Sequence, residues 1–231
     1  MVPKLEVENH FELEALPPYD FDLSVRKAID IARGASRNHW SSLLGSRAGA
    51  KLSSMGTVDK PRLLCTLFSQ EKLGDAEEEK YLEEVKWRLA LDEDLSEFYQ
   101  MAGKDVVLKK VVKDLYGMRE MGRTGIFGWL VIAILLQNAP VKRSNEMIDY
   151  LLKRYAEPVI FGGETHYLPL SPFKLADADL KDLRKGKLGY RAEYIKSLAA
   201  SFLGDEKQEG LPTEEAKEEL MRLRGVGSYT A

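Results

Sequence analysis

The stretch that decides the fold is Leu220-Met221-Arg222-Leu223-Arg224-Gly225-Val226-Gly227-Ser228-Tyr229-Thr230-Ala231. Its pattern predicts a helix that runs into a Gly-x-Gly turn, with Ser228 placed to cap a second helix. The two glycines allow positive φ and leave the amides of the turn uncovered, so successive N–H groups beside a helix N-terminus can hold a phosphate oxygen. The same pattern is also typical of an ordinary helix C-cap followed by a tight turn.

The chain before this turn is predicted to be an α+β protein. Alternating apolar residues predict strands over residues 5–13, 21–25 and 62–68, and the Gly-, Ser- and Ala-rich stretch 34–57 indicates loops and short strands. From Asp75 onward the pattern is helical. Helices are expected from Asp92 or Asp94 and over residues 106–115, 124–137, 141–155, 171–176, 190–202 and 213–223. We therefore expect a small antiparallel β domain over residues 1–90 and an all-α domain over residues 91–231.

Composition restricts the class of protein. The 231 residues are 44% hydrophobic and 31% charged, with a net charge of -3, which is typical of a globular chain with a real core. Charge is segregated: residues 101–154 carry 10 basic and 5 acidic side chains, and residues 181–201 carry 6 basic and 2 acidic ones. These blocks can offer a basic face to a polyanion, or they are simply solvated helix faces.

Several kinds of site and location are excluded or disfavoured. The lone Cys65 excludes a disulfide scaffold, a Cys-rich zinc site and iron–sulfur ligation, and the three histidines show no metal-ligand spacing. The most apolar window, Ile126 to Leu136, is shorter than the roughly 20 residues that a membrane span needs. No targeting segment is visible, so we expect a cytoplasmic protein with no membrane partner. His166 lies in a loop, residues 161–167, that could line a binding pocket or simply connect two helices, and we favour the connection.

The terminal turn resembles the hairpin of the helix-hairpin-helix DNA glycosylase superfamily, whose pattern is Leu-x-Gly-Val/Ile-Gly-x-x-Thr/Val-Ala. Three further segments resemble this family in the same order along the chain. They are Asp92-Glu93-Asp94-Leu95-Ser96-Glu97-Phe98-Tyr99, the apolar helix from Leu130 that ends in Gln137-Asn138, and Leu188-Gly189-Tyr190-Arg191-Ala192-Glu193-Tyr194-Ile195. The resemblance covers residues 88–231 and is strongest to the branch of 3-methyladenine DNA glycosylase II and 8-oxoguanine DNA glycosylase. It implies a β domain followed by a helix-hairpin-helix domain.

The resemblance also implies roles for individual residues. Asn138 would enter the gap left by a flipped nucleotide, although an Asn there also ends helices well. Arg143 and Arg191 would contact the cytosine opposite the lesion, and Tyr190 would wedge against the neighbouring base pair. Alone, either arginine could equally be a solvated helix residue or a phosphate contact. The hairpin residues that would hold DNA are Gly225, Val226, Gly227 and Tyr229.

Two features depart from the family pattern. Tyr229 occupies the position at which the 8-oxoguanine enzymes carry the lysine that forms a Schiff base. We therefore expect base release without strand cleavage. The catalytic aspartate of the family lies downstream of the hairpin, so its position falls past Ala231, and no catalytic residue is assigned. We accordingly expect the helix-hairpin-helix domain to be incomplete at its C-terminal end.

The resemblance therefore implies a base-excision repair enzyme that flips a damaged purine out of duplex DNA and hydrolyses its N-glycosidic bond. The alternative is a noncatalytic helix-hairpin-helix protein that binds duplex or damaged DNA, which the missing aspartate would favour. No cofactor is needed for either role, and we expect a monomer. The lesion stays open, because the set that would read cytosine points to 8-oxoguanine and Tyr229 points to alkylated or deaminated purines.

Overall fold

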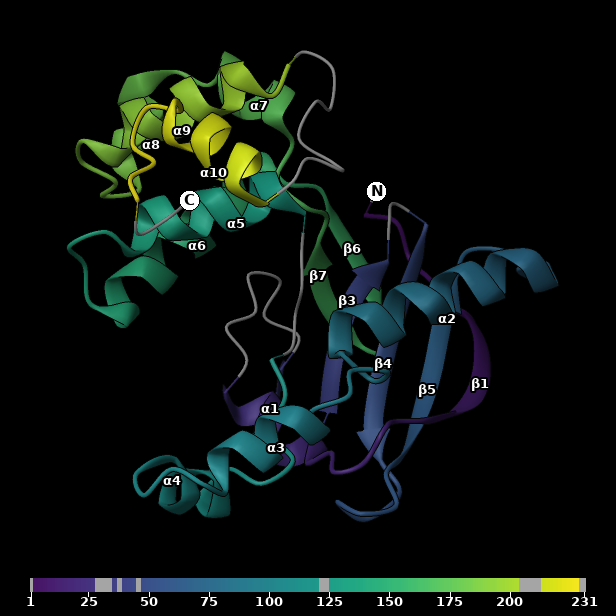
Figure 1. Cartoon of the computed structure of the whole chain (residues 1–231). Helices are drawn as coiled ribbons and strands as arrows, with labels where there is room; N and C mark the ends of the chain where they lie inside the picture. Colours follow the sequence, from purple (N-terminus) through teal and green to yellow (C-terminus); the bar gives the residue numbers. More distant parts are fainter. Residues whose placement is uncertain are drawn as a thin grey trace. The chain divides into compact units, whose positions relative to one another are not determined.

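The computed structural model describes residues 2–27, 35–36, 39–44, 47–120, 125–203 and 213–228. Within it the chain divides into two compact units (Figure 1). Unit 1 comprises residues 1–123 and 158–166, and unit 2 comprises residues 124–157 and 167–231. Each unit is described separately below.

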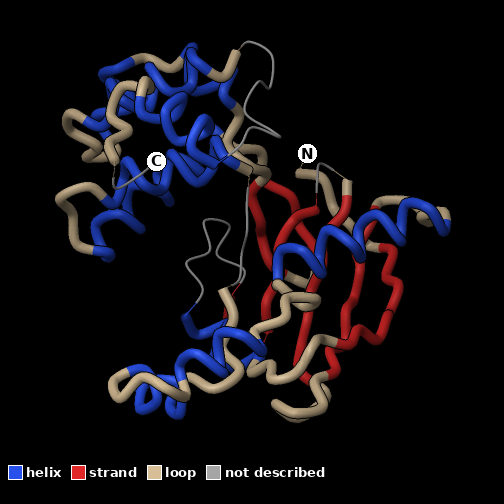
Figure 2. The backbone as a smooth tube through the Cα atoms, in the orientation of Figure 1, coloured by secondary structure: helices blue, strands red, loops and turns tan. Residues whose placement is uncertain are grey.

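Unit 1 contains an antiparallel sheet with the strand order β1-β5-β4-β3-β2 among its described residues (Figure 2). The strands are β1 (Val7–Glu14), β2 (Ala35–Ser36), β3 (His39–Leu44), β4 (Ala48–Ser54) and β5 (Arg62–Ser69). Strand β5 lies between β1 and β4 and places Cys65 opposite both Phe11 of β1 and Leu52 of β4. The expected strands near residues 5–13 and 62–68 are confirmed. The stretch 34–57 contributes three paired strands, more regular structure than its small residues indicated.

Helix α2 (Asp75–Leu89) covers one face of this sheet (Figure 1). Its buried residues Tyr81, Val85 and Leu89 recur every four positions and join the core formed by the strands. The opposite side of the helix is rich in acidic residues and exposed to solvent.

The expected strand at residues 21–25 is wrong, because this segment is helix α1 (Phe21–Lys27). The Asp20 carboxylate accepts a hydrogen bond of 2.8 Å from the Leu23 amide, which is an N-cap. Phe21 and Val25 are both 3% exposed and lie one helical turn apart. Over only five residues, the alternation of Phe21, Leu23 and Val25 does not separate a period of 2 from one of 3.6, and the cap decides for the helix.

The expected connection at residues 161–167 does lie between two helices, but it contains regular structure. The chain forms a hairpin of β6 (Pro158–Phe161) and β7 (Glu164–Tyr167), closed by Gly162 and Gly163 at φ of 57° and 82°. Both glycines adopt the left-handed backbone that a two-residue hairpin turn requires. The hairpin belongs to unit 1, where the ring of Phe161 packs on Phe68 and stacks on the buried His166.

Helices α3 (Ser96–Ala102) and α4 (Leu108–Asp114) also belong to unit 1, so the units divide after Arg123 rather than at residue 90. The buried Arg119 explains this division, because its guanidinium donates to the carbonyls of Leu16 and Glu93. Its backbone amide donates to Ser24 Oγ. These hydrogen bonds attach the segment after α4 to the N-terminal part of the chain.

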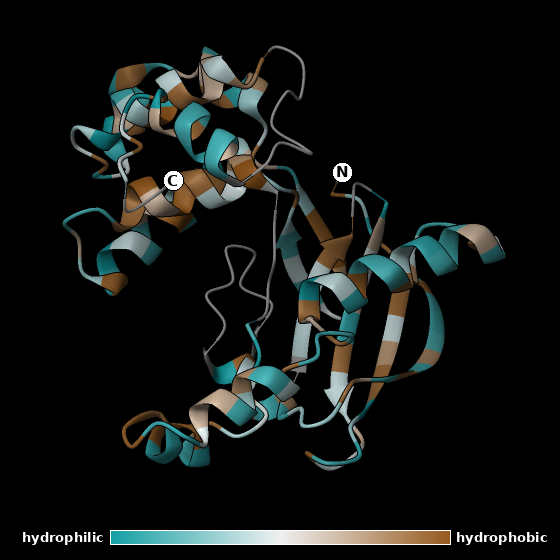
Figure 3. Cartoon of the chain, in the orientation of Figure 1, coloured by the Kyte–Doolittle hydropathy of each residue, from teal (hydrophilic) through white to brown (hydrophobic). Residues whose placement is uncertain are grey.

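Unit 2 is helical throughout its described residues. Its helices are α5 (Ile126–Leu136), α6 (Val141–Tyr155), α7 (Pro172–Asp177), α8 (Leu180–Lys185), α9 (Arg191–Ser201) and α10 (Thr213–Met221). Helix α5 is strongly apolar (Figure 3), and α9 packs against α5, α7 and α8. Except for α8, which was not among the expected helices, they agree with the expected ones within a few residues. Thr124, expected to open α5, lies outside the described residues.

Candidate nucleic-acid interface

The Gly-x-Gly turn follows α10 and has the backbone that its sequence indicated. Gly225 has φ of +90°, and the Val226 amide donates a 3.0 Å hydrogen bond to the Leu223 carbonyl, which tightens the turn. Val226 is 7% exposed and anchors the turn in unit 2, whereas Gly227 and Ser228 are exposed. Apart from its chain neighbours, no described residue has an atom within 4 Å of the position that a Cβ on Gly227 would take.

The end of α5 is joined to this turn. Gln137, the first residue after the helix, donates from Nε2 to the Gly225 carbonyl at 2.6 Å. The next residue, Asn138, is exposed and has φ of 47°. This left-handed conformation is uncommon outside glycine, and Asn is one of the residues that adopt it most readily. The hydroxyl of Ser144 on α6 donates to the Leu135 carbonyl at 2.9 Å and helps to end α5 here.

The start of α9 meets the same place. Arg191 is 6% exposed, and its guanidinium donates to the backbone carbonyls of Gln137 and Leu188. Its Cζ lies 4.7 Å from the centroid of the Tyr190 ring, a cation–π arrangement. Tyr190 itself is 45% exposed. The tyrosine is thus presented to solvent while the neighbouring arginine is turned into the protein.

Tyr194 links the tyrosine at the start of α9 to the turn. Its ring packs edge-on against Tyr190, with centroids 5.4 Å apart, and Arg224 lies over it at 5.6 Å. It also fills the space beside Gly225. Neither Tyr194 nor the side chain of Gln137 is among the sequence-predicted site residues. The spacing of Tyr190 and Tyr194 by four residues was the available signal, since it places both on one helix face.

Arg143 lies near the start of α6 and is exposed. One of its amino groups donates to the Lys187 carbonyl at 3.0 Å, which attaches α6 to the connection between α8 and α9. That connection also holds two residues with φ of 60°, Lys187 and Gly189. A guanidinium has five N–H donors, so this one hydrogen bond leaves donors for another acceptor.

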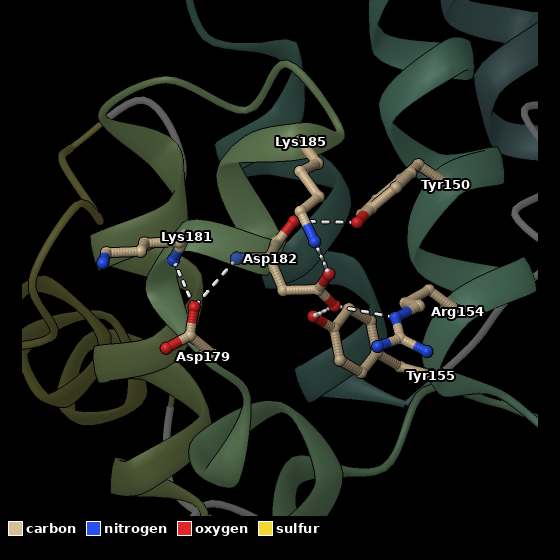
Figure 4. A network of polar contacts seen from close by, with 7 residues as sticks. All are labelled: Tyr150, Arg154, Tyr155, Asp179, Lys181, Asp182 and Lys185. Carbon is tan, nitrogen blue, oxygen red and sulfur yellow. Dashed lines mark hydrogen bonds and ion pairs between the residues drawn. The ribbon is translucent and has the colours of Figure 1, made fainter.

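An ion-pair network fixes the other end of the α8–α9 connection (Figure 4). The carboxylate of Asp182 on α8 accepts hydrogen bonds from Arg154 (2.7 Å), Tyr155 (2.8 Å) and Lys185 (3.0 Å). These donors, Arg154 first, hold the pKa of the Asp182 carboxyl well below its ordinary value. The pKa of Tyr155 is raised, chiefly by burial and then by its hydrogen bond to the carboxylate. This arrangement fixes α8 on α6.

The structure thus brings most of the sequence-predicted residues of unit 2 together. Hydrogen bonds and a ring contact connect four residues into one cluster, namely Gln137, Tyr190, Arg191 and Gly225. Asn138 belongs to it as the chain neighbour of Gln137, and Arg143 joins it through Lys187. Tyr229 lies outside the described residues. In the part of the chain that the structure describes, no group of acidic, histidine or cysteine residues could hold a metal ion, and no helix is both long and apolar enough to span a bilayer.

Comparisons with known proteins agree on one class of enzyme. No protein-family model matches the chain. It is 27% identical over 160 residues to DNA-3-methyladenine glycosylase of Bacillus subtilis, covering 66% of this chain and 51% of that protein. Its fold is similar to 3-methyladenine DNA glycosylase of Archaeoglobus fulgidus, with a TM-score of 0.76 and 18% identity over 95% of this chain and 76% of that one. The Clostridium acetobutylicum 8-oxoguanine glycosylase/lyase gives a TM-score of 0.72 and 18% identity over 96% and 76% of the two chains.

These relatives and structural neighbours are DNA glycosylases, which confirms the resemblance read from the four motifs and the expected α+β fold. The chain spans about half the length of the curated relatives it matches, 51% and 57% of them.

Proposed function

We propose that this chain forms the DNA-binding part of a base-excision DNA glycosylase, which flips a damaged purine out of duplex DNA and hydrolyses its N-glycosidic bond. The observation that carries the proposal is the connected cluster in unit 2. Gln137 joins the Gly-x-Gly turn to the exposed Asn138, and Arg191 joins both to the exposed Tyr190. A phosphate-binding turn, an exposed amide and an exposed aromatic ring are held together on one unit.

In this proposal the turn holds the DNA backbone. Backbone N–H groups can bind phosphate oxygens without a side-chain charge. We assign this role to the exposed Gly227 and Ser228, because the Val226 amide already donates to the Leu223 carbonyl. Arg222 and Arg224 precede the turn and are exposed, and they form ion pairs with Glu219 and Glu193. Phosphate contacts position a protein on duplex DNA but do not read its sequence.

The exposed side chains beside the turn act on the bases. Asn138 enters the gap that the flipped nucleotide leaves and hydrogen-bonds the orphaned base, while Tyr190 wedges against the adjacent pair. Arg143 has donors left over after its bond to Lys187 and reads the opposite base. Arg191 is buried and bonded to backbone carbonyls, so we assign it a positioning role in place of a base contact.

We further propose that base release occurs without strand cleavage. A lyase step requires an amine that forms a Schiff base with the sugar, and the chain carries Tyr229 at the position of the family's lysine. A phenol cannot form that adduct. The Clostridium acetobutylicum neighbour is described as a glycosylase/lyase, so this property separates the proposed activity from that of a fold neighbour.

Duplex binding by the 231-residue chain is the first test. Fluorescence anisotropy would compare an intact duplex with the same duplex carrying a tetrahydrofuran abasic-site analogue, over a range of salt concentrations. We expect tighter binding to the abasic duplex, because it no longer has to be unstacked, and an affinity that falls steeply with salt. Equal, salt-independent affinities for both duplexes would refute the proposal.

Base release is tested with a second protein, because residues 1–231 include no residue at the position of the family's catalytic aspartate. A chimera would join this chain at the hairpin to the segment that follows the hairpin of the Bacillus subtilis relative. It would be assayed on duplexes that carry 8-oxoguanine, hypoxanthine or 3-methyladenine, with and without hot alkali. Strand breaks that appear only after alkali support the proposal, and the responsive lesion identifies the substrate. Binding with no base release from any lesion would favour the noncatalytic DNA-binding alternative.

A further inference from the structure

Gln137 takes part in two hydrogen bonds that connect three segments distant in sequence. Its side chain donates to the Gly225 carbonyl in the turn, 88 positions away, and its backbone carbonyl accepts from Arg191 at the start of α9, 54 positions away. Since Gln137 lies just past the end of α5, neither hydrogen bond belongs to a helix. The residue therefore stands between the turn on one side and α9 on the other.

Because Arg191 is buried, its guanidinium depends on the particular hydrogen-bond partners that it finds at this connection. A buried guanidinium is costly unless its donors find partners, and here those partners are two backbone carbonyls. Its Nε finds none among the described residues. Removing the guanidinium would leave the Gln137 carbonyl without its donor, and removing the Gln137 amide would leave the Gly225 carbonyl without its donor.

Asn138 follows directly, with its left-handed backbone at φ of 47°. The peptide that precedes it carries the carbonyl held by Arg191, and the same residue holds the turn through its side chain. The backbone at Asn138 is thus tied through Gln137 both to the turn at Gly225 and to the start of α9.

We propose that Arg191 and Gln137 are positioning residues that couple the phosphate-binding turn to Asn138, so that gripping the backbone and filling the gap are one event. This inference rests on the proposed function, which it deepens. It predicts that loss of either residue weakens recognition of the gap more than it weakens binding to DNA as such.

The test uses Gln137→Met and Arg191→Met, which keep the length of the side chains but remove their donors. Gln100→Met and Arg62→Met, at exposed positions of unit 1, are the matched controls. The readout is the ratio of affinities for abasic and intact duplexes at one salt concentration, with thermal unfolding by circular dichroism as the check of folding. We expect each test variant to lower this ratio by about fivefold, the effect of one lost hydrogen bond. The controls should keep it.

Coupling is then tested by combination. Asn138→Ala should lower the ratio in the wild-type background and change it little in the Gln137→Met background, because the side chain is already misplaced there. Additive losses, or ratios within twofold of wild type in both test variants, would overturn the inference. Arg191→Lys, which keeps the charge and most of the stem, replaces Arg191→Met if the latter does not fold.

A DNA-free measurement keeps the two proposals separable. In ¹⁵N NMR spectra, Arg191→Met should shift the amides of Gly225 and Val226, which Arg191 does not contact directly, and this effect should disappear in the Gln137→Met background. If wild type shows no preference for the abasic duplex but these shifts occur, the proposed function fails and the coupling stands. If the preference is present but the shifts are absent, the coupling fails and the function stands.

Discussion

Gly225 lies directly against the ring of Tyr194: a Cβ atom on Gly225 would come within 2.6 Å of Cδ2 of that ring. The backbone of Gly225 is also in the left-handed region, at φ of +90°. Two independent constraints therefore require glycine at this position. The ring that excludes a Cβ is the same one that packs on Tyr190, so the turn and the proposed wedge share one support.

Gly225→Ala should therefore be costly and Gly227→Ala mild. Gly225→Ala places a Cβ on a residue with positive φ and against the Tyr194 ring. Together these two effects should lower the free energy of unfolding by about 2 kcal/mol or more. Gly227 is not in the positive-φ region and a Cβ there meets nothing within 4 Å. Urea unfolding of both variants measures the difference. Equal stabilities of the two variants would contradict the turn geometry. Adding Tyr194→Ala to Gly225→Ala should recover only the part of the lost stability that comes from the overlap with the ring.

Asn138→Gly and Asn138→Ala should separate backbone strain from side-chain function. Glycine adopts the observed φ without strain, whereas this left-handed backbone costs alanine about 1 kcal/mol of stability. The Ala variant should therefore be the less stable of the two. Both lack the amide and should lose the preference for an abasic duplex. Thermal unfolding and duplex anisotropy check these two outcomes. A Gly variant that keeps the preference would remove Asn138 from the proposed interface.

Arg143→Met should reduce discrimination between bases opposite an abasic analogue. If Arg143 reads cytosine, its loss should cost about 1–3 kcal/mol of that selectivity, which is about fivefold or more in affinity ratio. Lys142→Met, at the exposed neighbouring position on α6, is the control for lost charge alone. Competition binding with each of the four bases opposite the analogue measures the ratio. Equal effects of the two substitutions would assign Arg143 to the phosphate backbone.

Asp182 should make the stability of unit 2 depend on pH. Its pKa is lowered in the folded protein by Arg154, Tyr155 and Lys185, so its contribution is present above the unfolded pKa of about 3.9 and is lost as pH falls toward the folded pKa. Asp182→Asn should be less stable than wild type at pH 7, and the difference should shrink below about pH 4. Thermal melts from pH 7 to pH 2 test this, with the exposed Asp177→Asn as control. A difference that does not change with pH would count against the ion pairs.

Cys65 should be unreactive until unit 1 unfolds. Burial in the middle of the sheet raises the pKa of its thiol to about 12, so almost no thiolate is present at pH 8. In the unfolded chain the pKa returns to about 8.5, which makes the thiol reactive. Titration with a chromogenic disulfide reagent should give no fast reaction in buffer and one thiol per chain in urea. Fast reaction in buffer would show that strand β5 opens readily.

Local patterns were sufficient for much of the fold. Helices α5, α6 and α9 and strands β1 and β5 follow from apolar spacing, prolines and caps, because these signals act within a few residues. Residues 21–25 were ambiguous, since five residues fit two periods. Gly162-Gly163 was a hairpin signal that the sequence analysis passed over, and the pairing of β6 with β7 follows from it.

Spacing along the chain is sufficient to predict the Gly-x-Gly turn, the order of the four motifs and the residues proposed to meet DNA. The tertiary structure decided which of those residues face solvent. Arg191 and Tyr190 are adjacent in sequence, yet one is 6% exposed and the other 45%. Gln137, which ends a helix in the sequence, became the link between the turn and α9 only when three distant segments met. Burial and long-range hydrogen bonds depend on which segments pack together, and no local pattern contains that information.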